Sequence, residues 1–295
     1  MRWAEGFIAV DWGTTNRRAW RLDAGGRVAD EMADDQGILA IPTGAFPGAV
    51  ATLTARLGDL PLLLAGMIGS NRGWLEAPYV PAPAALPDLV AGLRWIEPRR
   101  IAIVPGVSFE REERADVMRG EEVQILGAAA AGLVGPDATV CHPGTHNKWI
   151  RLEGRRIAAF RTVMTGELFN LLKAHSILSD LLDEPAKPND AFAAGVRHGL
   201  GEDDLTAELF SVRARVLLGK SDPAQASSYV SGLLIGGDLR VGLGLAGGGE
   251  IVVMGRPDLT GLFAAALAEA GCTGREVEGE EAFLAGARRL AELII

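Results

Sequence analysis

The chain has 295 residues, of which 48% are hydrophobic and 23% are charged, and its formal net charge is -9. These proportions are typical of a packed globular protein and exclude a disordered or fibrous chain. The acidic balance disfavours a dedicated nucleic-acid binder, because phosphate backbones require a net basic face. It does not exclude a small anionic substrate, which a local cluster of arginines can hold.

The cysteine content and the apolar segments bear on the compartment. Cys141 and Cys272 are too few for a disulfide framework, and no CxxC pair is present, which indicates a reducing environment. Charges or glycines interrupt every apolar stretch before the roughly 20 residues that cross a bilayer. The first residues run into a short apolar segment and Asp11, without the pattern of a signal peptide. We therefore expect a cytoplasmic protein with no membrane partner and no nucleic-acid partner.

The first half of the chain opens with three predicted strands joined by tight turns, before any helix. A segment rich in proline and alanine, residues 74–98, is predicted to contain long loops. The other predicted elements are strands at 7–10, 17–22, 27–32, 62–65 and 101–104, and helices at 45–57 and 121–131, the last one ending at Gly132.

After residues 134–137 the pattern begins again with three strands and then helices. The predicted strands are 139–142, 146–152, 156–163 and 251–254, and the predicted helices are 168–182, 191–199, 205–218, 223–239, 260–270 and 280–293. The two halves share this order of elements and almost no residues. We therefore predict a duplicated α/β architecture with an N-terminal domain at 1–136 and a C-terminal domain at 137–295.

Three familiar patterns do not fit their usual context. Residues 242–247 spell GxGxxG, but a dinucleotide site needs a strand before it and a helix after it, and here a helix precedes. We interpret this segment as a helix-to-strand loop. Residues 219–221 resemble the end of a Walker A loop, yet the residues before them look helical. Cys141, His142 and His146 would point in different directions along a strand and turn, which argues against a metal site.

Two strand-turn-strand units remain, at residues 11–16 and 143–146. Glycine in such a turn lets backbone N–H groups and threonine hydroxyls approach phosphate oxygens. Asp11, at a strand end, is suited to hold hydrated Mg²⁺. Each unit taken alone favours an ordinary hairpin with a capping Asp. Two such units, one opening each half of the chain and facing each other, are what a kinase needs to hold ATP from both sides. The predicted nucleotide-binding residues are Gly13, Thr14, Thr15, Asn16, Gly144, Thr145 and His146.

Six blocks of sequence resemble the 2-dehydro-3-deoxygalactonokinase family, and together they cover nearly the whole length. The blocks are residues 11–16, 65–74, 118–122, 143–149, 160–168 and 231–236. The resemblance implies two ribonuclease-H-like domains of the actin/hexokinase/Hsp70-like ATPase fold with an interdomain cleft. It also implies ATP-dependent phosphorylation of 2-dehydro-3-deoxy-D-galactonate on its terminal 6-hydroxyl, in D-galactonate catabolism. Gly255 matches the glycine of the family's adenosine-binding turn.

A sugar-acid substrate needs a cation for its carboxylate and amide or backbone donors for its hydroxyls. Residues in the matched blocks that could supply these groups are Asn71, Arg72, Trp74, Arg119, Lys148, Arg161 and Glu167. For any single arginine the alternative is a solvated surface cation. For Trp74 the alternative is packing in the core.

Phosphoryl transfer also needs a carboxylate that takes the proton of the acceptor hydroxyl. Glu121 and Glu122 open a predicted helix, at a position that resembles the catalytic aspartate of other kinases of this fold. We expect the helix dipole to keep the base ionised. The alternative is that the pair only improves the helix start, in which case Glu167 is the next candidate. Asp11 completes the predicted catalytic set.

Three other functions stay open at this point. A kinase of the same fold could act on another small acceptor, such as pantothenate or a hexose. A non-catalytic nucleotide-binding regulator would bind ATP without acceptor-stimulated ADP release. A phosphatase of the same fold would release phosphate without a sugar acid. The expected ligands are ATP, Mg²⁺ and a small sugar acid, and a homodimer is left open.

Overall fold

The computed structural model describes residues 2–202 and 204–294, and they form two compact units. Unit 1 runs to Pro136 and also contains Glu153–Ala159 and the C-terminal segment from Glu280. Unit 2 contains Asp137–Leu152 and Phe160–Gly279. The last helix, α9 (Gly279–Ile294), was expected in the second domain and instead packs almost entirely with unit 1.

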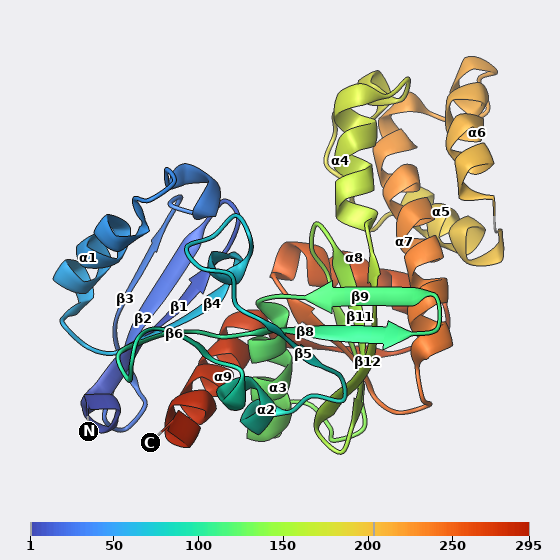
Figure 1. Cartoon of the computed structure of the whole chain (residues 1–295). Helices are drawn as coiled ribbons and strands as arrows, with labels where there is room; N and C mark the ends of the chain where they lie inside the picture. Colours follow the sequence, from blue (N-terminus) through green and yellow to red (C-terminus); the bar gives the residue numbers. More distant parts are fainter. Residues whose placement is uncertain (1, 203, 295) are drawn as a thin grey trace. The chain divides into compact units, whose positions relative to one another are not determined.

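Unit 1 is built on a six-stranded sheet in the order β3-β2-β1-β4-β7-β6 (Figure 1). Strands β1, β2 and β3 form an antiparallel meander, β4 and β7 run parallel to β1, and β6 is antiparallel to β7. Their bounds are β1 (Gly6–Trp12), β2 (Arg17–Asp23), β3 (Val28–Asp34), β4 (Leu62–Gly66), β6 (Arg94–Glu97) and β7 (Ile101–Ile103). The buried strands β1 and β4 carry the core and end at the same edge.

Three α-helices pack with this sheet. Helix α1 (Phe46–Leu57) buries Phe46 and Leu53 in one hydrophobic cluster with Trp12. Helix α3 (Glu121–Ala131) meets α9 closely where Gly127 faces Gly286. The start of α3 lies beside the end of β4, where a Cβ on Gly120 would lie 3.2 Å from Cα of Gly66.

Unit 2 repeats the plan with a five-stranded sheet in the order β12-β11-β10-β13-β14. Strand β10 pairs antiparallel with β11 and parallel with β13, which in turn is parallel to β14. The bounds are β10 (Thr139–His142), β11 (Asn147–Glu153), β12 (Arg156–Val163), β13 (Ile251–Gly255) and β14 (Gly274–Glu278). The predicted duplication of three meandering strands followed by parallel strands is confirmed.

The helices of unit 2 are α4 (Thr165–His175), α5 (Asp190–Gly201), α6 (Leu205–Leu217), α7 (Ala226–Leu245) and α8 (Pro257–Glu269). Helices α5 and α6 lie beside the long helix α7 (Figure 1). A Cβ on Gly232 of α7 would lie 2.1 Å from the carbonyl oxygen of Phe192 in α5, so only glycine permits this close approach. No helix in the described part of the chain is long and apolar enough to cross a membrane.

The prediction of long loops at residues 74–98 is wrong. This segment contains β5 (Tyr79–Pro81), helix α2 (Leu86–Ala91) and β6. Strand β5 pairs with β8 (Gly106–Arg111), which forms a hairpin with β9 (Arg114–Met118). These strands and β14 were not predicted, because short strands at the edge of a sheet or in the three-stranded sheet lack the apolar alternation that marks a core strand.

Two helix ends also differ from the prediction. Helix α7 continues to Leu245, so residues 242–245 are helical rather than part of a loop. A Cβ on Gly242 would lie 2.0 Å from the ring of Trp149, which shows that this glycine lets the helix pass over the indole. Helix α4 ends at His175 instead of 182, because Ser176 is extended and its hydroxyl donates to the carbonyl of Leu172.

Candidate active site

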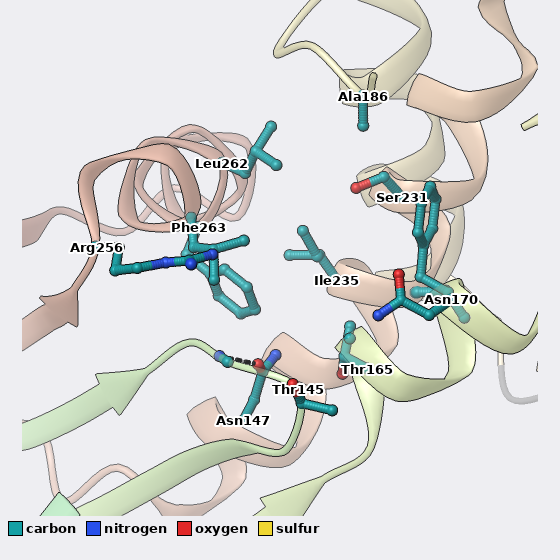
Figure 2. Close-up of a pocket in the computed structure, with 15 residues that line it drawn as sticks. Thr145, Asn147, Thr165, Asn170, Ala186, Ser231, Ile235, Arg256, Leu262 and Phe263 are labelled. Carbon is teal, nitrogen blue, oxygen red and sulfur yellow. Dashed lines mark hydrogen bonds between the residues drawn. The ribbon is translucent and has the colours of Figure 1, made fainter. Parts of the chain in front are cut away.

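Unit 2 contains a cavity of about 290 Å³ where the β10–β11 turn meets the start of α4, the start of α8 and the middle of α7. Figure 2 shows Arg256, Leu262 and Phe263 on one side and Asn170 and Ser231 on the other. The complete lining is Gly144, Thr145, Asn147, Thr165, Gly166, Phe169, Asn170, Ala186, Ser231, Leu234, Ile235, Arg256, Leu259, Leu262 and Phe263. The walls are mostly apolar with a few polar groups, as in small-molecule sites.

Two of the predicted nucleotide residues line this cavity, and a third lies beside the turn that carries them. Gly144 and Thr145 line it. Gly255 ends β13 at φ +154°, and a Cβ there would lie 3.7 Å from the carbonyl oxygen of Pro143 in the same turn. A Cβ on Gly166 would lie 2.4 Å from the carbonyl oxygen of Gly144, so the start of α4 packs directly on the turn.

The backbone N–H of Gly144 already has a hydrogen-bond partner within the protein. It donates to Oδ1 of Asn147 at 2.7 Å, the dashed line in Figure 2. The carbonyl of Thr145 accepts the N–H of Glu167 at 2.9 Å. Hydrogen bonds therefore connect the turn to the first residue of β11 and to the first turn of α4.

The remaining predicted residues of unit 2 lie outside the cavity lining. His146 and Glu167 contact each other through Nε2 and Oε2 and are both partly exposed beside the turn. Lys148 is buried on β11 and has an interaction partner. Arg161 lies half-buried on β12.

Unit 1 gathers the predicted catalytic carboxylates at the ends of β1 and β4. A Cβ on Gly66 would lie 3.5 Å from Oδ1 of Asp11, and a Cβ on Gly120 would lie 3.2 Å from Cα of Gly66. Both glycines have positive φ, +91° and +110°, which other residues rarely adopt. Gly120 directly precedes Glu121 at the start of α3, so Asp11 and the glutamate pair share one edge of the sheet.

Glu122 is fully buried, and both of its carboxylate oxygens accept the N–H of Gly120, at 2.9 and 2.7 Å. Desolvation, followed by the neighbouring charge of Glu121, raises the pKa of Glu122 to about 8. The expectation that the helix start keeps this residue ionised is wrong, because the cost of burying the charge outweighs the dipole. Glu121 is half-buried, and its Oε2 accepts the N–H of Arg119 at 3.1 Å.

The turn between β1 and β2, residues 13–16, resembles the turn of unit 2 in that its glycine N–H is hydrogen-bonded within the protein. The N–H of Gly13 donates to the carbonyl of Asn16 at 2.9 Å, so it too is used inside the turn. The side chains of Thr14, Thr15 and Asn16 are exposed. Asp11 is one-fifth exposed and forms an ion pair of 2.8 Å with Arg18.

The predicted substrate residues of unit 1 lie close to this edge or on a turn beyond it. Arg119 places its guanidinium 4.3 Å from the ring centroid of Tyr79 and donates to the carbonyl of Ala77 at 2.8 Å. Asn71 and Arg72 are exposed on the turn that follows β4.

Trp74, near the same turn, is half-buried against the hydrophobic cluster of unit 1. It stacks on Phe46 with ring centroids 6.5 Å apart. This contact supports the core-packing interpretation of Trp74.

Sequence reasoning missed several residues around the cavity, above all Asp238, Asn170 and Phe263. Asp238 is 1% exposed in α7 and contacts Asn147. One signal was available: Asp238 is a lone carboxylate in a long apolar helical stretch just after the matched block 231–236. A buried charge in such a position requires partners.

Comparisons with known proteins agree along the whole chain. The profile of the 2-keto-3-deoxy-galactonokinase family matches residues 11–290. The 2-dehydro-3-deoxygalactonokinase of Escherichia coli K12 is 37% identical over 292 residues, covering 98% of each chain. A solved structure from Sinorhizobium meliloti, described as a candidate 2-dehydro-3-deoxygalactonokinase, has a TM-score of 0.87 at 36% identity and covers 97% of this chain and 98% of its own.

A more distant likeness concerns the fold alone. Component A of (R)-2-hydroxyglutaryl-CoA dehydratase from Acidaminococcus fermentans has a TM-score of 0.53 at 12% identity, covering 98% of each chain. The fold is that of the actin/hexokinase/Hsp70-like ATPases, as predicted. With a family match over most of its length and a relative of this identity and coverage, the chain belongs to the 2-keto-3-deoxy-galactonokinase family.

Proposed function

We propose that this protein transfers the γ-phosphoryl group of ATP to the 6-hydroxyl of 2-dehydro-3-deoxy-D-galactonate, as a cytoplasmic enzyme of D-galactonate catabolism. The 37% identity over 98% of the chain to a kinase of that name carries the proposal. In the reaction the bond between the γ-phosphorus and the bridging oxygen of ADP breaks. A bond from phosphorus to the sugar-acid oxygen forms, and the hydroxyl proton passes to a carboxylate.

The cavity of unit 2 is proposed to hold the nucleotide. Its apolar wall of Leu259, Leu262 and Phe263 suits a purine ring, and Asn170 and Ser231 offer polar groups on the other side. The phosphates would then lie at the turn of Gly144 and Thr145, where the start of α4 adds its positive dipole end. Arg256, at the start of α8, supplies a cation at the cavity wall.

We propose that Mg²⁺ accompanies ATP and that Asp11 is its protein ligand. In the described ranges no three His, Cys, Asp or Glu side chains converge on one point, so an all-protein metal cage is not built. Mg²⁺ in kinases typically uses one or two carboxylates together with phosphate oxygens and water, and the partly exposed Asp11 fits this donor set. The ion would neutralise charge on the phosphates, while Asp11 would hold it and the hydroxyls of Thr14 and Thr15 would bind phosphate oxygens.

Proton acceptance is assigned to the pair Glu121 and Glu122. Glu122 has a raised pKa, which suits a base working near neutral pH, whereas Glu121 is the more accessible of the two. Asn71 and Arg72 are proposed to bind the hydroxyls and the carboxylate of the sugar acid, since both side chains are exposed beyond the same strand edge. Arg119, His146, Lys148, Arg161 and Glu167 remain candidates for supporting contacts.

The test is ADP release from the purified protein with ATP and Mg²⁺ across a panel of acceptors. We expect 2-dehydro-3-deoxy-D-galactonate to give the largest kcat/KM, and the product to carry phosphate on O6 by NMR. The panel includes its C4 epimer, pantothenate and glucose. Faster turnover of any of these, phosphate release without an acceptor, or ATP binding without turnover would overturn the proposal.

A further inference from the structure

Asp238 is a buried carboxylate of α7, the long helix that forms one wall of the cavity. Its Oδ2 accepts hydrogen bonds from Nδ2 of Asn147 and the hydroxyl of Thr165, and its Oδ1 accepts Nε1–H of Trp149 at 2.6 Å. Asn147 and Trp149 belong to β11, and Thr165 begins α4. One carboxylate therefore joins three elements that meet at the nucleotide cavity.

The position of Asp238 on α7 explains this reach. Ser231 and Ile235, seven and three residues earlier, line the cavity, and Gly242, four residues later, packs on Trp149. Residues at these spacings share one face of a helix. One face of α7 thus carries in turn the cavity-lining residues, the buried carboxylate of Asp238, and the glycine that packs on β11.

Asn147 connects Asp238 to the phosphate turn. An ionised carboxylate only accepts hydrogen bonds, so it fixes which end of the Asn147 amide faces it: the NH₂ group. The amide oxygen then points the other way and accepts the N–H of Gly144 at 2.7 Å. Asp238 therefore fixes the orientation of the Asn147 amide, and this orientation provides the acceptor for the Gly144 N–H.

The same carboxylate holds the second wall of the turn. Thr165 donates to Asp238, and the next residue, Gly166, packs on the carbonyl of Gly144. Burial raises the pKa of Asp238, and its three hydrogen-bond donors act in the opposite direction. The cost of burying this charge is thus partly offset by three donors, of which Asn147 contacts the turn directly and Thr165 precedes the glycine that packs on it.

We propose that Asp238 is a positioning residue of the nucleotide site: through Asn147 and Thr165 it holds the Gly144 turn in the shape that receives the phosphates of ATP. The inference rests on the proposed function for the identity of the ligand. The link from Asp238 to Gly144 itself exists without ligand.

The first test is Asp238→Asn. An amide at position 238 that keeps its oxygen toward Trp149 turns its NH₂ group toward Asn147 and Thr165. The hydroxyl of Thr165 can accept from this group, but the NH₂ group of Asn147 cannot, so the Asn147 amide loses its fixed orientation. We expect KM for ATP to rise roughly tenfold, the equivalent of about one good hydrogen bond, with a smaller change in KM for the sugar acid. Hydrogen exchange of the Gly144 N–H, measured without nucleotide, should accelerate.

The rescue is the double exchange of Asn147→Asp with Asp238→Asn. The carboxylate introduced at position 147 can accept from the N–H of Gly144 and from the new amide at position 238. The oxygen of that amide can still accept from Trp149, and the hydroxyl of Thr165 can accept from its NH₂ group. We expect this double variant to regain most of the ATP affinity and of the Gly144 protection. A double variant that is as impaired as Asp238→Asn overturns the proposed chain of hydrogen bonds.

A matched control separates positioning from loss of stability. Val230→Ala removes a buried methyl pair from α7 in a separate hydrophobic cluster, so it should lower Tm without changing KM for ATP. If Val230→Ala raises KM in proportion to its loss of stability, Asp238 has only a structural role.

If Asp238→Asn does not fold, Asn147→Ala is compared with Trp149→Phe. Each removes one donor to Asp238, but only Asn147→Ala frees the Gly144 N–H, so only it should raise KM for ATP and speed Gly144 exchange. Equal effects would overturn the proposal. A wild-type protein that neither binds ATP nor turns over contradicts the proposed function instead, and the exchange of Gly144 still reports on the Asp238 link.

Discussion

Glu122 accepts the N–H of Gly120 through both of its carboxylate oxygens while its side chain is closed off from solvent. Gly120 is the left-handed residue that also contacts Gly66 beside Asp11. The buried carboxylate of Glu122 is thus hydrogen-bonded to the glycine that lies next to the ends of β1 and β4, where the proposed catalytic carboxylates gather. Its raised pKa, about 8, makes its protonation state change in a range that is easy to measure.

The free energy of unfolding should depend on pH because of the raised pKa of Glu122. Because the pKa of Glu122 is about 8 in the folded protein and 4.5 in the unfolded chain, the folded protein holds a proton that the unfolded chain releases between these values. The contribution is present below about pH 4.5 and is lost as pH rises to about 8. Relative to Glu122→Gln, the wild type should lose up to about 1.4 kcal/mol per pH unit in that window. Urea unfolding of both proteins from pH 5 to 9 measures this difference, and parallel curves would contradict it.

Turnover should identify which glutamate accepts the proton. We expect one of Glu121→Gln and Glu122→Gln to lower kcat by roughly 10²–10⁴ at saturating substrates and the other to do much less, since adjacent helical positions point about 100° apart. If the base is Glu122, kcat of the wild type also falls as pH drops below about 8. If both variants keep most of their turnover, neither is the base and Glu167→Gln is tested next.

Asp11→Asn should lower kcat at least roughly 100-fold and leave the protein folded, because it removes a charge at a partly exposed strand end and no volume from the core. Steady-state kinetics and thermal unfolding are measured together. The control is Asp30→Asn. Asp30 lies on β3 of the same sheet, and its carboxylate is likewise paired with an arginine, Arg56 of α1. Near-normal turnover of a folded Asp11→Asn protein would remove Asp11 from the mechanism.

Arg72→Ala should raise KM for the sugar acid roughly 10- to 100-fold and leave KM for ATP nearly unchanged, because it removes one cation that is proposed to bind the substrate carboxylate. Arg27→Ala provides the comparison, since Arg27 is an 86% exposed arginine of unit 1 on a different turn. An equal effect of both variants would indicate a loss of general attraction between the protein and the anion.

Two glycines of α7 should respond in opposite ways to alanine. Gly232→Ala places a Cβ 2.1 Å from the carbonyl oxygen of Phe192 and should cost about 1–3 kcal/mol in the free energy of unfolding. Gly237→Ala meets nothing within 4 Å and should be neutral or stabilise by up to about 1 kcal/mol, through better helix propensity. Chemical denaturation of the two variants settles the comparison, and similar losses in both would show that the α5–α7 contact is loose.

The main elements of the fold could be predicted from the sequence, because their signals are local. The runs around β1 and β4 are continuously apolar, and Gly132 ends α3 with φ +74° where a helix stop was predicted. The two turns at Gly13 and Gly144 were also identified, since glycine and threonine between two strands mark a turn by themselves. Repetition of this order in both halves was enough to predict the duplicated fold.

What only the tertiary structure decided depends on partners far apart in the chain. Whether Gly242 lies in a loop or in a helix follows from the ring of Trp149, 93 positions earlier. The pKa of Glu122 follows from its enclosure, and no pattern around residue 122 measures how much water reaches a side chain. The role of Asp238 follows in the same way from Asn147, Trp149 and Thr165, which tertiary packing alone brings within hydrogen-bond reach.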